Sequence, residues 1–211
     1  MCDCLSGDSV PGDPRALYAN EWNTGMCNAP CANPLCCLAG LLCPCPSACF
    51  IRRQALDTDM TRYKCCQGYY DFCCFQAGNF GESSCPDLCN GLEALLCFSC
   101  SISSTRMLVM DTRDIRPDPC DNRLIGLNNC LQLLSCICNI LAMFIEELEA
   151  LADLVDFIAD VVFALVSSCM IAQVNYELNH GARPVNWNKP LMPRAGSKAH
   201  REMRNQAGGG V

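Results

Sequence analysis

Cysteine constrains the fold of this chain more than any other residue type. It occupies 22 of the 211 positions, and 17 of those 22 precede residue 101. The count includes three adjacent pairs, Cys36-Cys37, Cys65-Cys66 and Cys73-Cys74. Cysteine at about a tenth of a chain indicates disulfides, bound metal or lipidation. Each of these would cross-link or anchor the chain differently, so the state of the thiols decides between several classes of protein.

The first residues favour a reducing compartment. Residues 1–15 contain acids at Asp3 and Asp8 and no apolar run, which predicts neither a secretory signal nor a basic organellar leader. In the cytosol most thiols stay reduced or bind metal, and a chain of this length can bury a core without disulfides. The alternative is import into an oxidising space such as the mitochondrial intermembrane space.

Charge is distributed unevenly along the chain. Residues 178–211 carry six basic side chains and one acid, so the net charge of −7 leaves −12 for residues 1–177. A basic tail behind an acidic body predicts either a solvated tail or an arm that binds an acidic surface of protein or anionic lipid. The acidic body argues against nucleic acid as the main partner.

Composition shifts divide the chain into three parts. We expect an N-terminal arm over 1–26, a cysteine-rich helical domain over 27–178 and a basic extended tail over 179–211. The predicted fold class is mainly α: a compact cysteine-rich helical domain with irregular loops and extended termini. Prolines should interrupt the uncharged stretch 23–51, which leaves a short helix near 35–42.

The centre of the chain predicts two further helices around a charged loop. The first spans 91–110, and the loop 111–123 should be ordered by salt bridges or form a partner surface. Residues 124–145 are uncharged and long enough to cross a bilayer. Polar side chains recur through this second helix, so we predict that it is buried in a helical core. They are Asn128, Asn129, Gln132, Ser135 and Asn139.

Residues 146–177 predict a long amphipathic helix. Four acids fall at i, i+4, i+7 and i+11, on one helix face beside an apolar stripe. The acids are Glu149, Asp153, Asp156 and Asp160, and the stripe consists of Leu148, Leu151, Val155, Ile158, Val162 and Leu165. We expect the acidic face either to be solvated or to pair with a partner protein or with arginines of the chain. The candidate arginines are Arg106, Arg113, Arg116 and Arg123.

Several cysteines have the spacing of tetrahedral zinc sites, whose ligands often come in pairs two to four residues apart. The predicted ligands are Cys85, Cys89, Cys97 and Cys100 in one set and Cys36, Cys37, Cys43 and Cys45 in another. Both histidines, His180 and His200, lie in the tail, so cysteine alone would hold zinc in the core. One alternative is free thiols that pack as small apolar side chains. Another is palmitoylation, for which Cys2, Cys4 and the Cys36-Cys37 pair are candidates.

The pattern typical of an enzyme is missing from the sequence. A cysteine nucleophile needs a base nearby, and the cysteine-rich region contains no histidine. Glycine-rich phosphate loops are missing as well, since the terminal glycines belong to the tail. We therefore expect a protein without catalytic activity.

The segment CCLAGLLCPC at 36–45 resembles a family signature. It is similar to the double-cysteine and CPC pattern of the placenta-specific-eight family of cysteine-rich proteins, with a spacer of five residues where that family has four. The resemblance implies a membrane-associated, palmitoylated or metal-handling protein. The residues that carry it are Cys36, Cys37, Cys43 and Cys45.

A broader set of segments resembles the amastigote-associated cysteine-rich family of kinetoplastids and other protists. The segments are KCCQGYYDFCCFQAG (64–78), SISSTRMLVMD (101–111), RPDPCDNRLIGLNNCLQLLSCIC (116–138) and DLVDFIADVVFALVSSCMIAQVNYEL (153–178). The resemblance spans residues 36–178 and includes the DPCDNR loop. It implies a helical cysteine-rich protein of a protist and brings no enzymatic activity with it.

These patterns together predict a non-enzymatic accessory or structural subunit docked on a larger protein assembly or a membrane surface. Its termini and acidic helix face would make the contacts. The expected location is the cytoplasm or a membrane, and the resemblance to protist proteins suggests the flagellum or an organelle. The alternative is a metal-binding or cation-handling, membrane-associated protein with all-cysteine zinc sites.

Overall fold

The computed structural model describes residues 7–8, 12–70, 77–78, 81–194 and 196–208. Over these residues the fold is mainly α, as predicted, and contains no β-strand beyond one isolated bridge between Asn20 and Ile115. The α-helices are α1 (Ala29–Ala32), α2 (Pro34–Leu42), α3 (Pro44–Ala55), α4 (Pro86–Leu96), α5 (Phe98–Arg113), α6 (Pro119–Ala142), α7 (Glu149–His180) and α8 (Lys198–Gly208). Short 3-10 helices are η1 (Pro14–Leu17), η2 (Met60–Arg62), η3 (Cys65–Gly68) and η4 (Glu146–Leu148).

Proline begins many of these helices. The first residue of α2, α3, α4 and α6 is a proline, which is favoured there because the first helical N–H has no partner in the helix. The predicted short helix near 35–42 is therefore confirmed as α2, and it ends where Pro44 begins α3. The single helix predicted over 91–110 was wrong. Cys97 leaves helical geometry (φ −135°, ψ 51°), and the axes of α4 and α5 differ by 119° there.

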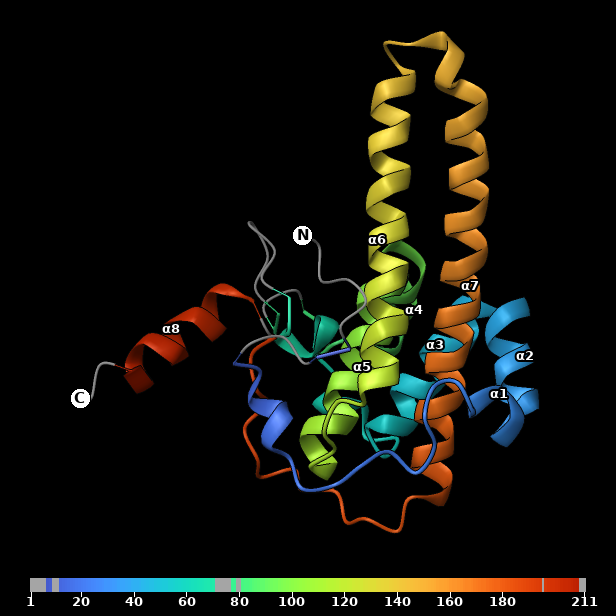
Figure 1. Ribbon diagram of the computed structural model, residues 1–211. Helices are drawn as coiled ribbons and strands as arrows, with labels where there is room; N and C mark the ends of the chain where they lie inside the picture. The colour runs from blue at the N-terminus through green and yellow to red at the C-terminus, as the bar shows by residue number, and fades with distance from the viewer. Residues whose placement is uncertain (1–6, 9–11, 71–76, 79–80, 195, 209–211) are drawn as a thin grey trace.

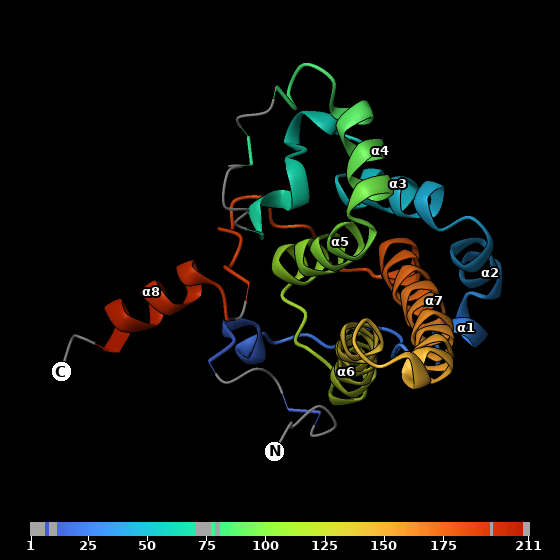
Figure 2. The same ribbon diagram turned by 90° about the horizontal axis from the view of Figure 1, so that it is seen from above.

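Helix α7 forms the centre of the body. It contacts α1, α2 and α3 on one side and α5 and α6 on the other, as the view from above shows (Figure 2). The side chains buried deepest around it include Met26, Leu56, Leu108, Ile171 and Val174. The core thus combines residues from the N-terminal segment, the cysteine-rich half and the long C-terminal helix.

Buried ion pairs connect the segments of the body. Arg15 lies beside Asp111 with 2.8 Å between Nε and Oδ1, and Arg52 beside Glu93 at 2.7 Å. Further pairs join Arg106 to Asp121 at 2.6 Å and Arg113 to Glu177 at 3.9 Å. The charged loop was predicted to be ordered by salt bridges or to form a partner surface, and its residues Asp114 and Arg116 form ion pairs with Lys189 and Glu21. The loop itself is shorter than 111–123, because α5 continues to Arg113 and α6 begins at Pro119.

The described parts of both termini lie across the body. In the N-terminal segment Arg15, Trp22 and Met26 are buried, and the Arg15 guanidinium donates to the carbonyl of Met192 at 2.6 Å. The tail is not extended throughout, because residues 198–208 form α8, which projects away from the body (Figure 1). His200 at the base of α8 is buried, with Nε2 lying 2.6 Å from the Gly12 carbonyl.

Helices α6 and α7 form an antiparallel hairpin whose upper part extends well beyond the body (Figure 1). The prediction of a buried core helix over 124–145 was wrong, since only 6% of the most apolar window of α6 is buried. The physical reason is that α7 alone packs along the upper half of α6. Three of the five polar side chains that suggested a buried helix, Gln132, Ser135 and Asn139, bond to α7 across the hairpin, and the rest of α6 is left uncovered.

Candidate functional site: an apolar hairpin and a cysteine cluster

Polar side chains hold the hairpin together from within. The Asn139 amide donates to both carboxylate oxygens of Asp156 at 2.8 Å, and the Ser135 hydroxyl donates to the same carboxylate. Nearer the body the Gln132 amide donates to the carbonyl of Ala159 at 3.1 Å. Ala159 is buried against α6, and small residues at such positions let two helices approach closely. The seam between α6 and α7 is therefore polar and narrow.

The outward surface of the hairpin is apolar. Eleven large aliphatic or aromatic side chains are exposed on it, namely Leu133, Leu134, Ile137, Ile140 and Leu141 on α6 and Leu151, Leu154, Phe157, Ile158, Val161 and Leu165 on α7. They include three members of the apolar stripe that the sequence predicted for residues 146–177. A helix of a water-soluble protein turns such a stripe to the core. In this hairpin Gln132, Ser135, Asn139 and Asp156 bond to the facing helix, whereas the large apolar side chains lie outside.

The acidic stripe does not pair with the candidate arginines. Asp156 bonds to α6, whereas Glu149, Asp153 and Asp160 are exposed. The arginine partners lie elsewhere: Arg106 pairs with Asp121, Arg113 with Glu177 and Arg116 with Glu21. Asp160 also lines a cavity of about 510 Å³ at the base of the hairpin, together with Asn128 and Gln132. One of the exposed acids of the stripe, Asp160, therefore faces a cavity of mixed polar and apolar lining.

Both hairpin helices are long and apolar enough to cross a membrane. The mean hydropathy of the most apolar window is 1.6 in α6 and 2.1 in the segment Glu146–His180. The 24 residues of α6 extend about 36 Å at 1.5 Å per residue, against a hydrocarbon core of about 30 Å. The bent pair α4 and α5 would qualify only as a broken span. The structure thus permits membrane association.

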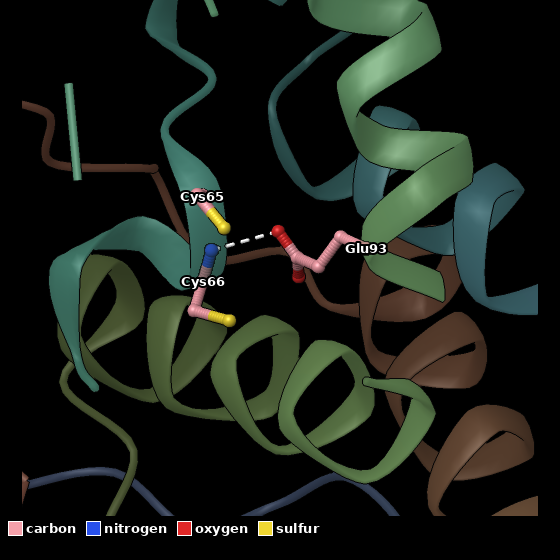
Figure 3. Close-up of side chains that lie close together, drawn as sticks. All are labelled: Cys65, Cys66 and Glu93. Atoms are coloured by element: carbon pink, nitrogen blue, oxygen red, sulfur yellow. Dashed lines mark hydrogen bonds between the residues drawn. The ribbon is translucent and has the colours of Figure 1, made fainter. Parts of the chain in front are cut away.

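A cluster of cysteines lies in the body, away from the hairpin. The Sγ atoms of Cys65 and Cys66 and a carboxylate oxygen of Glu93 lie within 4.8 Å of one another. Figure 3 shows the Cys65 sulfur and the Glu93 carboxylate facing each other, with the Cys66 amide bonded to Glu93 at 2.7 Å. The Cys65 amide donates to a second buried carboxylate, that of Glu82, at 2.6 Å. Two carboxylates therefore hold the backbone of the cysteine pair.

The backbone of this pair is strained. Cys66 (φ 47°) and Gln67 (φ 49°) both adopt the left-handed conformation, which costs side-chain-bearing residues about 1–3 kcal/mol each. The Gln67 side chain stabilises the turn by accepting from the Lys64 amide at 2.8 Å. A strained backbone of this kind persists only where neighbouring groups hold it in place. Here the carboxylates of Glu82 and Glu93 do so by accepting from the amides of Cys65 and Cys66.

Two more cysteines from the start of α5 lie beside the pair. The thiols of Cys66 and Cys100 share a hydrogen bond, which raises the pKa of Cys66 and lowers that of Cys100 to about 7. Burial and then the neighbouring Glu93 raise the pKa of Cys65, and burial raises the pKa of Cys97. At neutral pH, Cys100 is thus the thiol of this cluster that ionises most readily.

Glu93 is already engaged by protein groups. Its Oε1 accepts from the Arg52 guanidinium at 2.7 Å, and its Oε2 accepts from the Tyr63 hydroxyl at 2.8 Å and from the Cys66 amide. Burial, followed by the charge of Glu93, raises the pKa of Tyr63. A metal ion at Cys65 and Cys66 would have to share this carboxylate with Arg52. The cluster offers three possible ligand atoms. Its two thiols could bind a metal ion or remain as a pair of free thiols.

The cysteines predicted as zinc ligands lie in several places. Cys36 and Cys37 face α7, Cys43 ends α2, and Cys85 precedes α4. Within the described ranges the only group of three possible metal ligands is Cys65, Cys66 and Glu93. Cys97 and Cys100 lie near that group. The zinc sites predicted from spacing did not include Cys65 and Cys66, although these two cysteines are adjacent in the sequence. Zinc binding stays a prediction, and Cys2 and Cys4 lie outside the described residues.

Comparisons of the chain with protein-family models, with curated proteins and with solved structures found no match. The two family resemblances of the sequence therefore stay predictions.

Proposed function

We propose that this chain is a membrane-anchored, non-enzymatic accessory subunit, in which the α6–α7 hairpin is the anchor and the body is a docking platform. The observation that carries the proposal is the reversed polarity of the hairpin. Ser135, Asn139 and Asp156 bond to one another between the helices, and eleven large aliphatic or aromatic side chains are exposed on the surface together with the acids Glu149, Asp153 and Asp160. Helices in lipid have this arrangement because lipid cannot hydrogen-bond to polar groups.

The energies favour insertion. Full burial of one large apolar side chain gains about 1.5–3 kcal/mol over exposure to water, so eleven partly exposed ones gain on the order of 10 kcal/mol in lipid. Against this, Asp153 and Asp160 would each cost about 2.5–3.5 kcal/mol at the middle of a bilayer. Asp156 costs less because Asn139 and Ser135 satisfy its oxygens. The apolar gain exceeds the cost of the acids.

The position of the charges sets the depth of insertion. From Leu124 to Ala142, α6 has no charge and extends about 28 Å, close to the thickness of the hydrocarbon core. Arg123 would lie at the near surface, and Glu146 and Glu147 at the tip would reach the polar region on the far side. In the body, α2 packs on α7 through Gly40 and carries the exposed side chains Leu35 and Leu42.

The body has features of a docking platform. Helix α8 projects from it and carries Lys198 and Arg201 on its exposed surface, with Glu202 as its one acid. The body itself is acidic, so α8 is suited to an acidic surface of a larger assembly. The basic charge of α8 and its projection from the body support this role, which the sequence predicted for the tail as a whole.

Membrane extraction of the full chain tests the anchor. The wild-type protein is expected in the membrane pellet after alkaline carbonate treatment and in solution only with detergent. A variant with Ile137→Asp and Phe157→Asp should leave the pellet, because both charges face lipid. The control is Leu17→Asp, which changes an even more exposed apolar residue, on η1 in the body, and should stay in the pellet. Wild-type protein that is monodisperse in water without detergent would overturn the proposal.

The accessory role needs a separate test. Removal of residues 198–208 should leave the chain in the membrane and lower its native mass in mild detergent from that of an assembly to that of one chain. The control exchanges Lys198→Arg and Arg201→Lys, which keeps the charge. If the wild-type chain already runs as a single copy in mild detergent, the accessory role is refuted and the anchor is untouched.

A further inference from the structure

Two exposed thiols from distant parts of the chain lie in contact. The Sγ atoms of Cys27 and Cys120 are 2.9 Å apart, although 93 positions separate the residues in the sequence. A disulfide bond is about 2.05 Å long, so the two sulfur atoms need to approach by less than 1 Å to bond. Both side chains are exposed, which leaves them open to a soluble oxidant.

Buried bonds hold the two backbones in place next to the thiols. The Met26 amide, adjacent to Cys27, donates to Oδ1 of Asp121 at 2.8 Å, and Asp121 is adjacent to Cys120. Asp121 is fully buried and also accepts from Arg106 at 2.6 Å and from Gln173 at 2.7 Å. The thiol contact is therefore imposed by the core and does not depend on the flexibility of a surface loop.

The residue before the first turn of α6 also holds this helix start in place. The Asp118 side chain caps the helix by accepting from the amides of Cys120 at 2.8 Å and Asp121 at 3.3 Å. In the segment just before Cys27, the carbonyl of Thr24 accepts a hydrogen bond from the Gln173 side-chain amide of α7 at 3.0 Å. Both cysteines thus project from segments whose positions are defined by neighbouring hydrogen bonds.

We propose that Cys27 and Cys120 form a disulfide that fastens the N-terminal segment to the base of the α6–α7 hairpin. In the reaction the thiolate of one cysteine attacks a disulfide oxidant such as oxidised glutathione and forms a mixed disulfide with release of one reduced glutathione. The second thiolate then attacks the protein sulfur, forms the Cys27–Cys120 bond and releases a second reduced glutathione. The two protein thiols lose two protons and two electrons, which the two glutathione thiols receive.

This disulfide would act on the core. The segment it fastens contributes Trp22 and Met26 to the hydrophobic core, and the Trp22 ring lies 4.9 Å from the Arg106 guanidinium. Oxidation would close a loop that contains α1 to α5, which restricts the unfolded chain most when the loop is long. It would also mean that the body works in an oxidising compartment. The inference is independent of the proposed anchor, because the thiol contact lies outside the lipid-facing part of the hairpin.

Peptide mapping of the full chain in detergent tests the disulfide. After equilibration with reduced and oxidised glutathione at the ratio of an oxidising compartment, remaining thiols are alkylated and the protein is digested. We expect most chains to yield a Cys27–Cys120 linked peptide that disappears on reduction. Cys31 serves as the internal control, since it is exposed and only four positions from Cys27. It should carry the alkyl group in the same sample.

Variants and hydrogen exchange sharpen the result. Cys120→Ser should return Cys27 to the alkylated form, and Cys31→Ser should leave the link intact. In the wild-type protein the Met26 amide should exchange more slowly when oxidised than when reduced, a measurement that needs no variant. Cys27 and Cys120 alkylated as fully as Cys31 after oxidation, or Cys27 linked to another cysteine, would refute the assignment. Membrane extraction should be the same in both redox states, so failure here and failure of the anchor are distinguishable.

Discussion

Loss of one buried charge at Asp121 should destabilise the whole body. Asp121 is fully buried and accepts from groups of three different segments, namely the Met26 amide, Arg106 of α5 and Gln173 of α7. The substitution Asp121→Asn keeps the shape of the side chain and removes its charge. Arg106 then remains as a buried cation without a counter-ion. Burial disfavours the charged guanidinium and lowers its pKa, so the loss of the counter-ion is costly.

The expected effect is large. Removal of one member of a buried ion pair costs about 3–5 kcal/mol, a large part of the total stability of a typical domain. For a chain of this size the loss corresponds to a thermal midpoint lower by about 6–20 °C. The measurement is thermal unfolding in mild detergent, followed by circular dichroism, with denaturant unfolding as a second assay.

The chain offers a matched control for this substitution. Glu21→Gln makes the same chemical change in an ion pair with Arg116, but both partners are exposed, at 70% and 49% for their side chains. Exposed pairs contribute about 0–1 kcal/mol, so this variant should unfold within about 4 °C of the wild type. The double variant Arg106→Met with Asp121→Asn should recover part of the loss, because no unpaired charge stays buried. Equal effects of Asp121→Asn and Glu21→Gln would refute the reasoning.

Three other properties can be measured directly. Burial, followed by the charge of its carboxylate partner, raises the pKa of Tyr69, so folding favours the protonated phenol. The stability this provides is present below the pKa of an unfolded tyrosine, about 10, and is lost as the pH rises above it; Tyr69→Phe should flatten that fall in alkaline unfolding curves. Cys100, with its pKa lowered to about 7, should be alkylated faster at neutral pH than Cys97, whose pKa is raised, and equal rates by peptide mapping would contradict the hydrogen-bonded arrangement. Gly40→Leu should destabilise the protein by about 1–3 kcal/mol because a Cβ there meets α7 atoms at 3.2 Å, whereas Gly91→Leu, with no atom within 4 Å, should change the unfolding midpoint little.

The helical content could be predicted because it depends on local patterns. Prolines at 34, 44 and 119 are compatible with a first helical turn and incompatible with a helix interior, and the helices begin there. The break at Cys97 could not be predicted, because no proline or glycine stands at that residue. Beyond the break both helices pack on α3, and α5 also packs on α7.

The contacts between thiols could not be predicted from the sequence either. Spacing grouped Cys97 and Cys100 with Cys85 and Cys89, which are near them along the chain. In the folded body the turn at Cys66 brings its thiol to Cys100 instead, and Cys27 meets Cys120. Spacing indicates which cysteines share a helix face, whereas contacts between distant segments depend on how the helices pack.

The sequence by itself determined that this chain is a helical, cysteine-rich protein with a long uncharged segment and an acidic stripe on the helix that follows. Hydrophobic periodicity shows which side chains share a face, but not what that face contacts. Only the tertiary structure decided that Gln132, Ser135 and Asn139 of α6 bond to α7 and that the large apolar residues face outward. The physical reason is that each polar group needs a hydrogen-bonding partner, and here the partner is the neighbouring helix.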